Sequence, residues 1–493
     1  MTCMGDALLL TLPVLVPFLG AALALLLRKH PAAALMTGLA ASGFVLLASV
    51  ALLTRVMVDP RVPLTVFGGW PQGFGIGFSA ALPGSALVVV TALILFAAAI
   101  YAIGDIGPRR RRGGYDALML AMAGAMNGAC LTNDLFNLYV WFELALLAAL
   151  GLLTIDRRPA QIDGAIRYAA FAMLAATFIL IGVGMIYGMT GTLDIRTAGA
   201  VLADSPASVA SAVAAALLLG GLMLKSGLAP FHLWLPASYH TAPTTVAAVF
   251  AGLLTKMGFY ALLLVMVVIF GVGRGAPGGA QLTPLLGGIA ALTMLLCVAG
   301  ALGQTDMRRI LAYHVVAQVG YMMAALALGT RDGVTAAIFY MVHSMIVQAN
   351  LFFGAGLIRR ASASWDLTRA GGIVRREPLF ALLFAVPVLS LSGIPPFSGF
   401  WAKLFVIRES LDADMAWLGG VALLAGLLTI VSMSTFWSDA CWKDARRTSM
   451  RAVPKSGLVA MALLSAATVV IGLMPQWLWS IAQLSARLLE GQG

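Results

Sequence analysis

Fourteen apolar segments, each long enough to cross a lipid bilayer, constrain this 493-residue chain more than any other feature. A bilayer core requires about 20 apolar residues in a helix, and lipid-embedded segments must satisfy their own backbone polar groups. We therefore expect an all-α integral membrane protein of about 14 transmembrane helices. The segments cover residues 7–27, 32–54, 82–104, 115–132, 133–155, 166–190, 207–231, 242–271, 282–303, 310–329, 334–358, 378–407, 416–438 and 456–479.

Composition excludes several classes of protein. Hydrophobic residues make up 61% of the chain and charged residues only 10%, against roughly 25% in soluble domains. This balance excludes a cytoplasmic enzyme, a disordered protein and a nucleic-acid-binding protein, despite a net charge of +11. The four cysteines and five histidines are dispersed and match no disulfide framework or metal-ligand spacing. We expect no metal and no cofactor.

The basic residues predict the orientation. If the N-terminus lies outside, 21 of the 31 lysines and arginines fall on the cytoplasmic side and seven on the outer side, which is the positive-inside asymmetry. The run Arg109–Arg112 is then a topological anchor rather than a nucleic-acid patch. Arg28 and Lys29 follow the first segment and no positive charge precedes it, so we expect a retained helix rather than a cleaved signal peptide.

Three lysines and one glutamate lie inside hydrophobic segments: Lys225, Lys256, Lys403 and Glu143. Each charge at the bilayer centre costs about 2.5–3.5 kcal/mol even on a lenient scale. A static ion pair between Glu143 and one lysine would order the bundle, but it leaves two lysines without a carboxylate. Because burial makes a lysine amine easier to deprotonate, the set favours a proton relay.

Two histidines extend this relay. His314 and His343 lie on consecutive apolar segments between those of Lys256 and Lys403, and imidazole passes protons near neutral pH. Either one alone is commonly a satisfied buried polar group. His232 and His240 follow Lys225 in a proline-rich stretch, where they either line a cytoplasmic access route or cap a turn.

A short internal repeat predicts the architecture. Residues 226–231 (SGLAPF) resemble residues 392–397 (SGIPPF), and each copy has a buried lysine nearby. Paired broken helices in two halves of a membrane protein are typical of transport sites. The helix-breaking residues are Gly227, Pro230, Gly393, Pro395 and Pro396.

The repeat offset of 166 residues predicts two inverted five-helix units with broken helices 7 and 12. We expect the units at 115–271 and 282–438. Helices 1–3 lie before them in 1–114, and residues 439–493 form a cytoplasmic loop and helix 14.

Three motifs resemble a known family. Asp134–Glu143 (DLFNLYVWFE), Lys225–Pro236 (KSGLAPFHLWLP) and Ser392–Lys403 (SGIPPFSGFWAK) look like the antiporter-like subunits shared by respiratory complex I and Mrp-type cation/proton antiporters. The resemblance covers nearly the whole chain. Within that superfamily, Trp234–Pro243 (WLPASYHTAP) is similar to the D-type Mrp subunits, because complex I counterparts usually have an acidic residue shortly after the Leu-Pro.

The resemblance implies roles for the buried charges. Glu143 and Lys225 would form the charged pair, Lys256 the central relay, and Lys403 the terminal lysine of the second half-channel. Many relatives have a lysine on the eleventh helix where this chain has Gln348. Glutamine does not carry a proton as lysine does, so His343 and bound water would have to bridge the second half.

We therefore expect a membrane subunit of a multisubunit Na⁺ or K⁺/H⁺ antiporter in the bacterial inner membrane, not an enzyme. Its partners would be other subunits of the complex, protons, the cation and lipid, with no nucleic acid. Two alternatives stay open: a proton-pumping subunit of a complex I-like or membrane-bound hydrogenase complex, and an assembly scaffold whose charges only bind neighbouring subunits.

Overall fold

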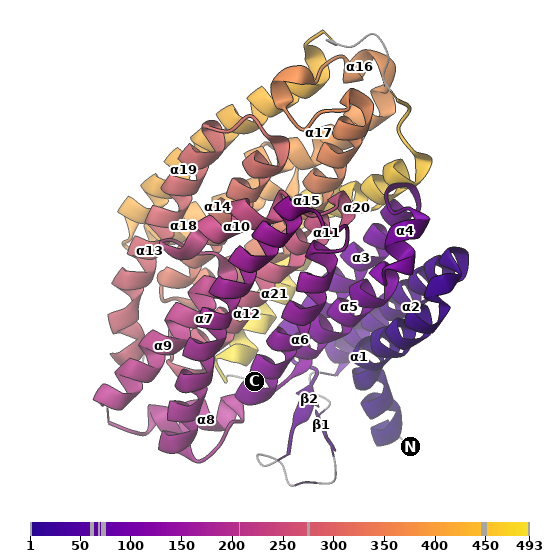
Figure 1. Ribbon diagram of the computed structural model, residues 1–493. Helices are drawn as coiled ribbons and strands as arrows, with labels where there is room; N and C mark the ends of the chain where they lie inside the picture. The colour runs from indigo at the N-terminus through magenta and orange to yellow at the C-terminus, as the bar shows by residue number, and fades with distance from the viewer. Residues whose placement is uncertain are drawn as a thin grey trace.

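The computed structural model describes residues 2–59, 64–67, 70, 75–206, 208–273, 277–444 and 451–491. Across these residues the chain is a bundle of long helices, with one short hairpin at one end (Figure 1). Four arginines of the charge count, Arg61, Arg274, Arg446 and Arg447, lie outside the described residues. The predicted all-α membrane fold is confirmed.

Twelve helical spans in the described residues are long and apolar enough to cross a membrane. The two other predicted segments are a 17-residue helix, α5 (Tyr115–Leu131), and a pair of shorter helices, α17 (Pro378–Ser392) and α18 (Ser398–Asp412). The number of fourteen crossings stays a prediction. The chain is nevertheless a multi-pass membrane protein.

The N-terminal unit consists of three long helices and a small hairpin. The helices are α1 (Thr2–Leu26, followed by a 3-10 turn at Leu27–Lys29), α2 (Pro31–Val58) and α3 (Leu82–Asp105). Strands β1 (Leu64–Val66) and β2 (Gly77–Ser79) pair antiparallel, with Thr65 opposite Phe78. The short α4 (Pro108–Arg112) leads into α5.

The predicted first five-helix unit begins with α5 and contains a broken helix. Its remaining elements are α6 (Leu135–Leu153), α7 (Pro159–Thr190), α8 (Ile195–Ala203), α9 (Val209–Ser226), a 3-10 turn (Phe231–Leu233), α10 (Trp234–Tyr239), α11 (Thr244–Val249), a π-helical turn (Phe250–Leu254), α12 (Thr255–Leu264) and a second π-helical turn (Val265–Ile269). The break falls between α9 and α10, where the sequence predicts it.

The predicted second unit repeats this order. It contains α13 (Pro277–Leu302), α14 (Met307–Ala327), α15 (Arg331–Ser362), a 3-10 turn (Leu367–Arg369), α16 (Ile373–Arg376), the broken pair α17 and α18, and α19 (Ala416–Trp437), which continues as a π-helical turn (Ser438–Trp442). Helical structure therefore extends past the boundary expected at 438. The final predicted segment, 456–479, divides into α20 (Lys455–Leu473) and α21 (Pro475–Leu489).

Matching aspartates mark the two units. Asp134 caps α6 and forms a β-bridge with Asp194, and Asp306 caps α14 and forms a β-bridge with Asp366. The first bridge lies at the end of the bundle with α8 and the hairpin, whereas the second lies at the end with α16 (Figure 1). Equivalent features at opposite ends fit the expected inverted repeat. The division into these units stays a prediction.

The core of the bundle is formed by the spans Thr244–Ile269, Met307–Ala327 and Arg331–Ser362, which are 94%, 94% and 100% buried in their most apolar windows. Lys256, His314 and His343 lie on these three spans and are 0–1% exposed. Polar groups in such surroundings require partners. We call the end of the bundle that carries α4 and α16 the basic face, because Arg109–Arg112, Arg359 and Arg360 lie there (Figure 1).

Candidate functional site

The predicted charged pair forms between α6 and α9. Lys225 Nζ lies 3.0 Å from Glu143 Oε1, and the side chains are 10% and 29% exposed. The Phe142 ring centre lies 5.2 Å from the same ammonium, a distance at which the ring face attracts a cation. The structure thus brings together two residues that are 82 positions apart in sequence.

The end of α9 determines where Lys225 lies. Gly227 has a left-handed φ of 71° and ends the helix, which leaves Lys225 in the last turn, at the negative end of the helix dipole. Trp234 Nε1 donates to the Leu224 carbonyl at 3.2 Å. A Cβ at Gly258 would lie 2.9 Å from the Lys225 carbonyl carbon, so glycine permits α12 to pack directly against this turn.

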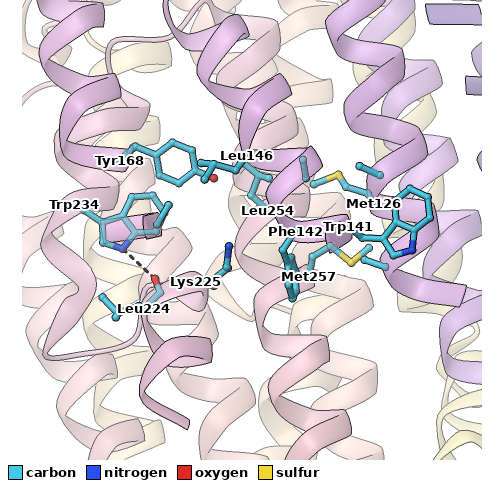
Figure 2. A pocket seen from close by; sticks show the side chains of 14 residues that line it. Met126, Trp141, Phe142, Leu146, Tyr168, Leu224, Lys225, Trp234, Leu254 and Met257 are labelled. Atoms are coloured by element: carbon cyan, nitrogen blue, oxygen red, sulfur yellow. Dashed lines mark hydrogen bonds between the residues drawn. The ribbon is translucent and has the colours of Figure 1, made fainter. Parts of the chain in front are cut away.

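A cavity of about 30 Å³ adjoins the pair (Figure 2). Figure 2 shows the Lys225 amine between Trp234 and Phe142, and Leu254 and Met257 line the same cavity. Such a volume exceeds the roughly 10–15 Å³ that one water molecule needs. Leu254 and Met257, which lie close to Lys256 in sequence, belong to this lining, whereas Lys256 itself does not.

Lys256 is fully buried on α12. Its Nζ donates to the Ala251 carbonyl at 2.7 Å, inside the π-helical turn Phe250–Leu254. A π-turn changes the regular bonding pattern of a helix, and such turns are frequent at functional sites. Lys256 forms no ion pair with any carboxylate among the described residues. Lys256 is therefore a buried amine whose hydrogen bond goes to a backbone carbonyl.

The second helix break holds Lys403. Gly393 has a φ of 84° and ends α17, and Lys403 on α18 reaches back to the C-terminal end of that helix. Its Nζ donates to the carbonyls of Leu391 at 2.9 Å and Ser392 at 3.1 Å. A cation at a helix C-terminus is stabilised by the helix dipole. Lys225 and Lys403 therefore both lie at a break, although one precedes it and the other follows it.

Serine hydroxyls bond to both buried histidines. His343 Nδ1 lies 2.8 Å from Ser398 Oγ, which in turn lies 3.1 Å from Ser390 Oγ across the break. His314 Nε2 lies 2.8 Å from Ser432 Oγ on α19. Each imidazole has a second nitrogen that is buried without a hydrogen-bond partner in the described residues.

Further polar groups lie between the histidines and Lys403. Tyr340 donates to Gln318 Oε1 at 2.6 Å and stacks on Tyr321, whose ring centre is 5.6 Å from Lys403 Nζ. Gln348, where the family resemblance leads us to expect a lysine, is fully buried, and both of its amide atoms lack a partner in the part of the chain that the structure describes. Buried polar atoms of this kind ordinarily bind ordered water.

Other predicted positions have simpler roles. His240 Nδ1 lies 2.8 Å from the Pro236 carbonyl, so this histidine caps the short α10. His232 is buried at 7% exposure in the turn before α10. Among the helix-breaking residues, Pro230 and Pro396 follow cis peptide bonds, and Pro395 lies with them in the turns that separate the half-helices.

The hydroxyl partners Ser390, Ser398 and Ser432 were not predicted from the sequence. Serines inside apolar segments could have indicated these partners, because a buried hydroxyl needs a hydrogen bond. Ser390 and Ser398 also flank the predicted break. Their contact with a histidine 55 positions away from Ser398 is a tertiary relation that helical periodicity does not contain.

Comparisons with known proteins agree on one family. The model for "NADH:quinone oxidoreductase/Mrp antiporter, TM" matches residues 132–429. The chain is 33% identical over 467 residues to the D-type subunit of the Na⁺/H⁺ antiporter from Alkalihalophilus pseudofirmus, covering 94% of this chain and 93% of that one.

Solved structures give the same picture. A chain of the Mrp complex from Dietzia sp. DQ12-45-1b superposes with a TM-score of 0.91 at 31% identity, covering 98% of this chain and 97% of that one. A chain of the membrane-bound sulfane sulfur reductase, an archaeal respiratory membrane complex, superposes with a TM-score of 0.90 at 24% identity, covering 99% and 98%. At that identity, the second likeness concerns the fold alone.

Proposed function

This chain belongs to the NADH:quinone oxidoreductase/Mrp antiporter transmembrane family, and we propose that it is the D-type, proton-translocating subunit of a multisubunit Na⁺ or K⁺/H⁺ antiporter. It lies in a bacterial inner membrane with its N-terminus outside. Proton entry down the proton motive force drives export of the cation. The chain acts as a transporter subunit and not as an enzyme.

One observation carries this proposal: ionisable groups within the apolar spans occupy both helix breaks and the core between them. Glu143 and Lys225 pair at the first break, Lys256 lies at a π-turn in the core, and Lys403 lies at the second break. In the described residues the hydrogen bonds of Lys256 and Lys403 go only to backbone carbonyls, so neither amine has a carboxylate counter-ion there.

The geometry supports a proton-transfer sequence. When Glu143 is neutralised, the Lys225 ammonium loses its counter-ion, and burial then favours release of its proton. The adjoining cavity is large enough for water, and its lining includes Leu254 and Met257, which lie close to Lys256 in the chain. Beyond Lys256, the unpaired polar atoms of His314, His343 and Gln348 are groups that hydration would link.

The cation is expected to follow a path shared with partner subunits. No group of three or more His, Cys, Asp or Glu side chains suited to a metal ion occurs among the described residues. Na⁺ prefers oxygen ligands, and Glu143 is 29% exposed in the middle of α6, where a neighbouring subunit can reach it. We therefore assign proton transfer to this chain and part of the cation path to its partners.

The test uses inverted vesicles from a strain that lacks its own antiporters. A proton gradient is imposed, NaCl or KCl is added, and a pH-sensitive dye follows the exchange. We expect cation-induced dissipation by the intact complex without an electron donor. Proton movement that requires oxidation of a donor would overturn the proposal and support the respiratory alternative.

A further inference from the structure

A second polar site lies on the basic face, away from the relay. It is a cavity of about 360 Å³ where the ends of α3 and α15 meet α4, the start of α11 and the segment before α20. Four arginines line it, Arg110, Arg359, Arg360 and Arg451, together with a single carboxylate, Asp105. None of these residues takes part in the proposed proton route.

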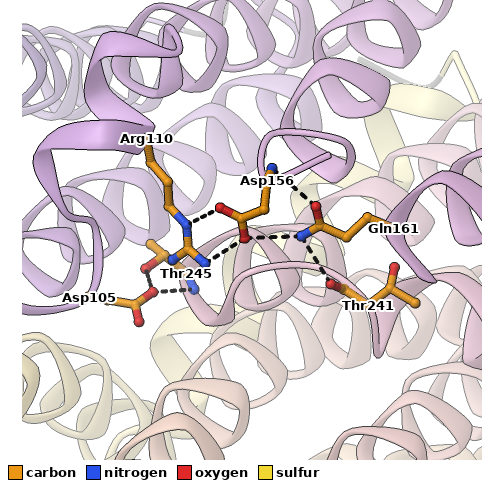
Figure 3. A network of polar contacts seen from close by, with 6 residues as sticks. All are labelled: Asp105, Arg110, Asp156, Gln161, Thr241 and Thr245. Carbon is orange, nitrogen blue, oxygen red and sulfur yellow. Dashed lines mark hydrogen bonds and ion pairs between the residues drawn. The ribbon is translucent and has the colours of Figure 1, made fainter. Parts of the chain in front are cut away.

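The positive charges in this cavity are only partly balanced. Arg110 forms two hydrogen bonds to Asp156, at 2.8 and 2.7 Å. Asp105 accepts from the backbone and hydroxyl of Thr245 at 3.2 and 2.7 Å (Figure 3). The other three arginines form no ion pair with a carboxylate among the residues that the structure describes.

Two of these three guanidinium groups are nevertheless held in place. Arg360 donates to the Gly104 carbonyl at 2.7 Å, and the Arg359 guanidinium lies 5.2 Å from the Trp365 ring centre. Positive-inside topology usually places arginines in solvent, where they need no contact with a carbonyl or an aromatic ring to hold them. Here the charges converge on a concave site whose lining includes the buried ring of Tyr101.

The chemistry of the lining identifies a ligand class. Guanidinium groups match phosphate oxygens with paired hydrogen bonds, and a volume of 360 Å³ suits a headgroup-sized ligand. Basic pockets between membrane helices are known to bind anionic lipid headgroups. We propose that this cavity binds a phosphate group, supplied by the headgroup of an anionic glycerophospholipid of the adjacent leaflet or by soluble phosphate.

The experiment uses the intact complex, purified in detergent and delipidated. Native mass spectrometry measures binding of phosphatidylglycerol, with phosphatidylcholine as the zwitterionic comparison and inorganic phosphate as a competitor. The test variant is R359Q/R360Q. A second variant, R451Q, changes an exposed arginine of the same cavity and leaves the hydrogen bond between Arg360 and the Gly104 carbonyl intact. R369Q/R375Q is the matched control, because it removes the same charge from pairs outside the cavity.

We expect one tight phosphatidylglycerol site per copy of this chain, weakened about tenfold in R359Q/R360Q and several-fold in R451Q. The control should bind as the unmodified complex does. Binding that resists inorganic phosphate supports the lipid as the source, and competition by inorganic phosphate, lost in R359Q/R360Q, supports the soluble anion.

Equal binding by the cavity variants and the unmodified complex would overturn the proposal. Equal affinity for phosphatidylcholine would also overturn it, because anionic recognition would then be lacking. If a neighbouring protein of the complex is lost when R359Q/R360Q is purified, the arginines belong to a protein interface, and the phosphate site is refuted.

Discussion

Glu143 is the residue on which the first half of the relay depends, because its carboxylate is the counter-ion of Lys225 at 3.0 Å. Glu143→Gln keeps the shape of the side chain and removes its charge. We expect cation-induced dissipation of a proton gradient to fall about 100-fold in inverted vesicles. Subunit content of the membranes should stay normal. Normal exchange at normal subunit content would refute the role.

Lys225→Arg separates a relay from a static ion pair. Arginine keeps the positive charge and can pair with Glu143, but it does not deprotonate in proteins. We expect an assembled complex with exchange reduced about 100-fold in the same vesicle assay. Arg55→Lys is the control, because it conserves charge in the pair with Asp6 on α1 and α2. An active Lys225→Arg complex would make Lys225 a structural cation only.

The charges inside the apolar segments and the Glu143–Lys225 pair were predicted from the sequence, whereas the partners of Lys256 and Lys403 were not. Glu143, Lys225, Lys256 and Lys403 are conspicuous because a charge within an apolar segment is costly. Backbone carbonyls carry no sequence signal, so the contacts of Lys256 with Ala251 and of Lys403 with Leu391 follow only from the fold. The proton-transfer role of all these residues stays a prediction.

At the scale of elements, the second break depends on close packing between α17 and α18. A Cβ on Gly399 would lie 1.8 Å from the Ser390 carbonyl oxygen and 2.9 Å from His343 Cε1. Gly399→Val therefore must separate the half-helices and displace the His343–Ser398 contact. We expect a loss of about 1–3 kcal/mol in stability and loss of exchange.

The Gly399→Val prediction is checked by thermal unfolding of the purified complex and by the vesicle assay. Gly420→Val on α19 is the matched control, because nothing lies within 4 Å of a Cβ there. Unchanged unfolding and exchange in Gly399→Val would show that this packing is not required.

On the basic face, Asp156 joins the loop after α6 to α4, through hydrogen bonds with Arg110 that lower the pKa of the Asp156 carboxyl (Figure 3). A lowered pKa in the folded state stabilises the fold above about pH 4, and this contribution is lost as the pH falls through the folded value. Asp156→Asn should therefore lower the unfolding temperature at pH 7, with the difference shrinking below pH 4.

Asp163→Asn provides the comparison for Asp156→Asn. Its partner Arg167 is 56% exposed and Asp163 is 61% exposed, so this surface pair contributes little. A pH-independent difference between Asp156→Asn and the unmodified complex would contradict the linkage to Arg110.

The boundaries of the helices show which features of these elements are predictable from the sequence and which are not. The two breaks were predictable, because Gly and Pro interrupt long apolar runs at 226–231 and 392–397. Residues 265–269 contain neither Gly nor Pro and residues 250–254 contain only Gly252, yet both stretches form π-helical turns. Met474 likewise separates α20 from the amphipathic α21 inside one predicted segment.

For the whole molecule, the decisive question is what the chain does without its partners. Its buried amines and imidazoles suit proton transfer, but the described residues contain no cluster of carboxylates that resembles a cation site. We therefore predict that the chain expressed alone gives no cation/proton exchange, whereas the complete complex does so without an electron donor. Vesicles containing either form are loaded with a proton gradient, and a pH-sensitive dye records the response to NaCl and KCl. The amount of the chain in the membranes is measured in parallel, so that a lack of exchange cannot be due to missing protein. Strong exchange by the single chain would place the cation path within it and refute a path shared with partner subunits.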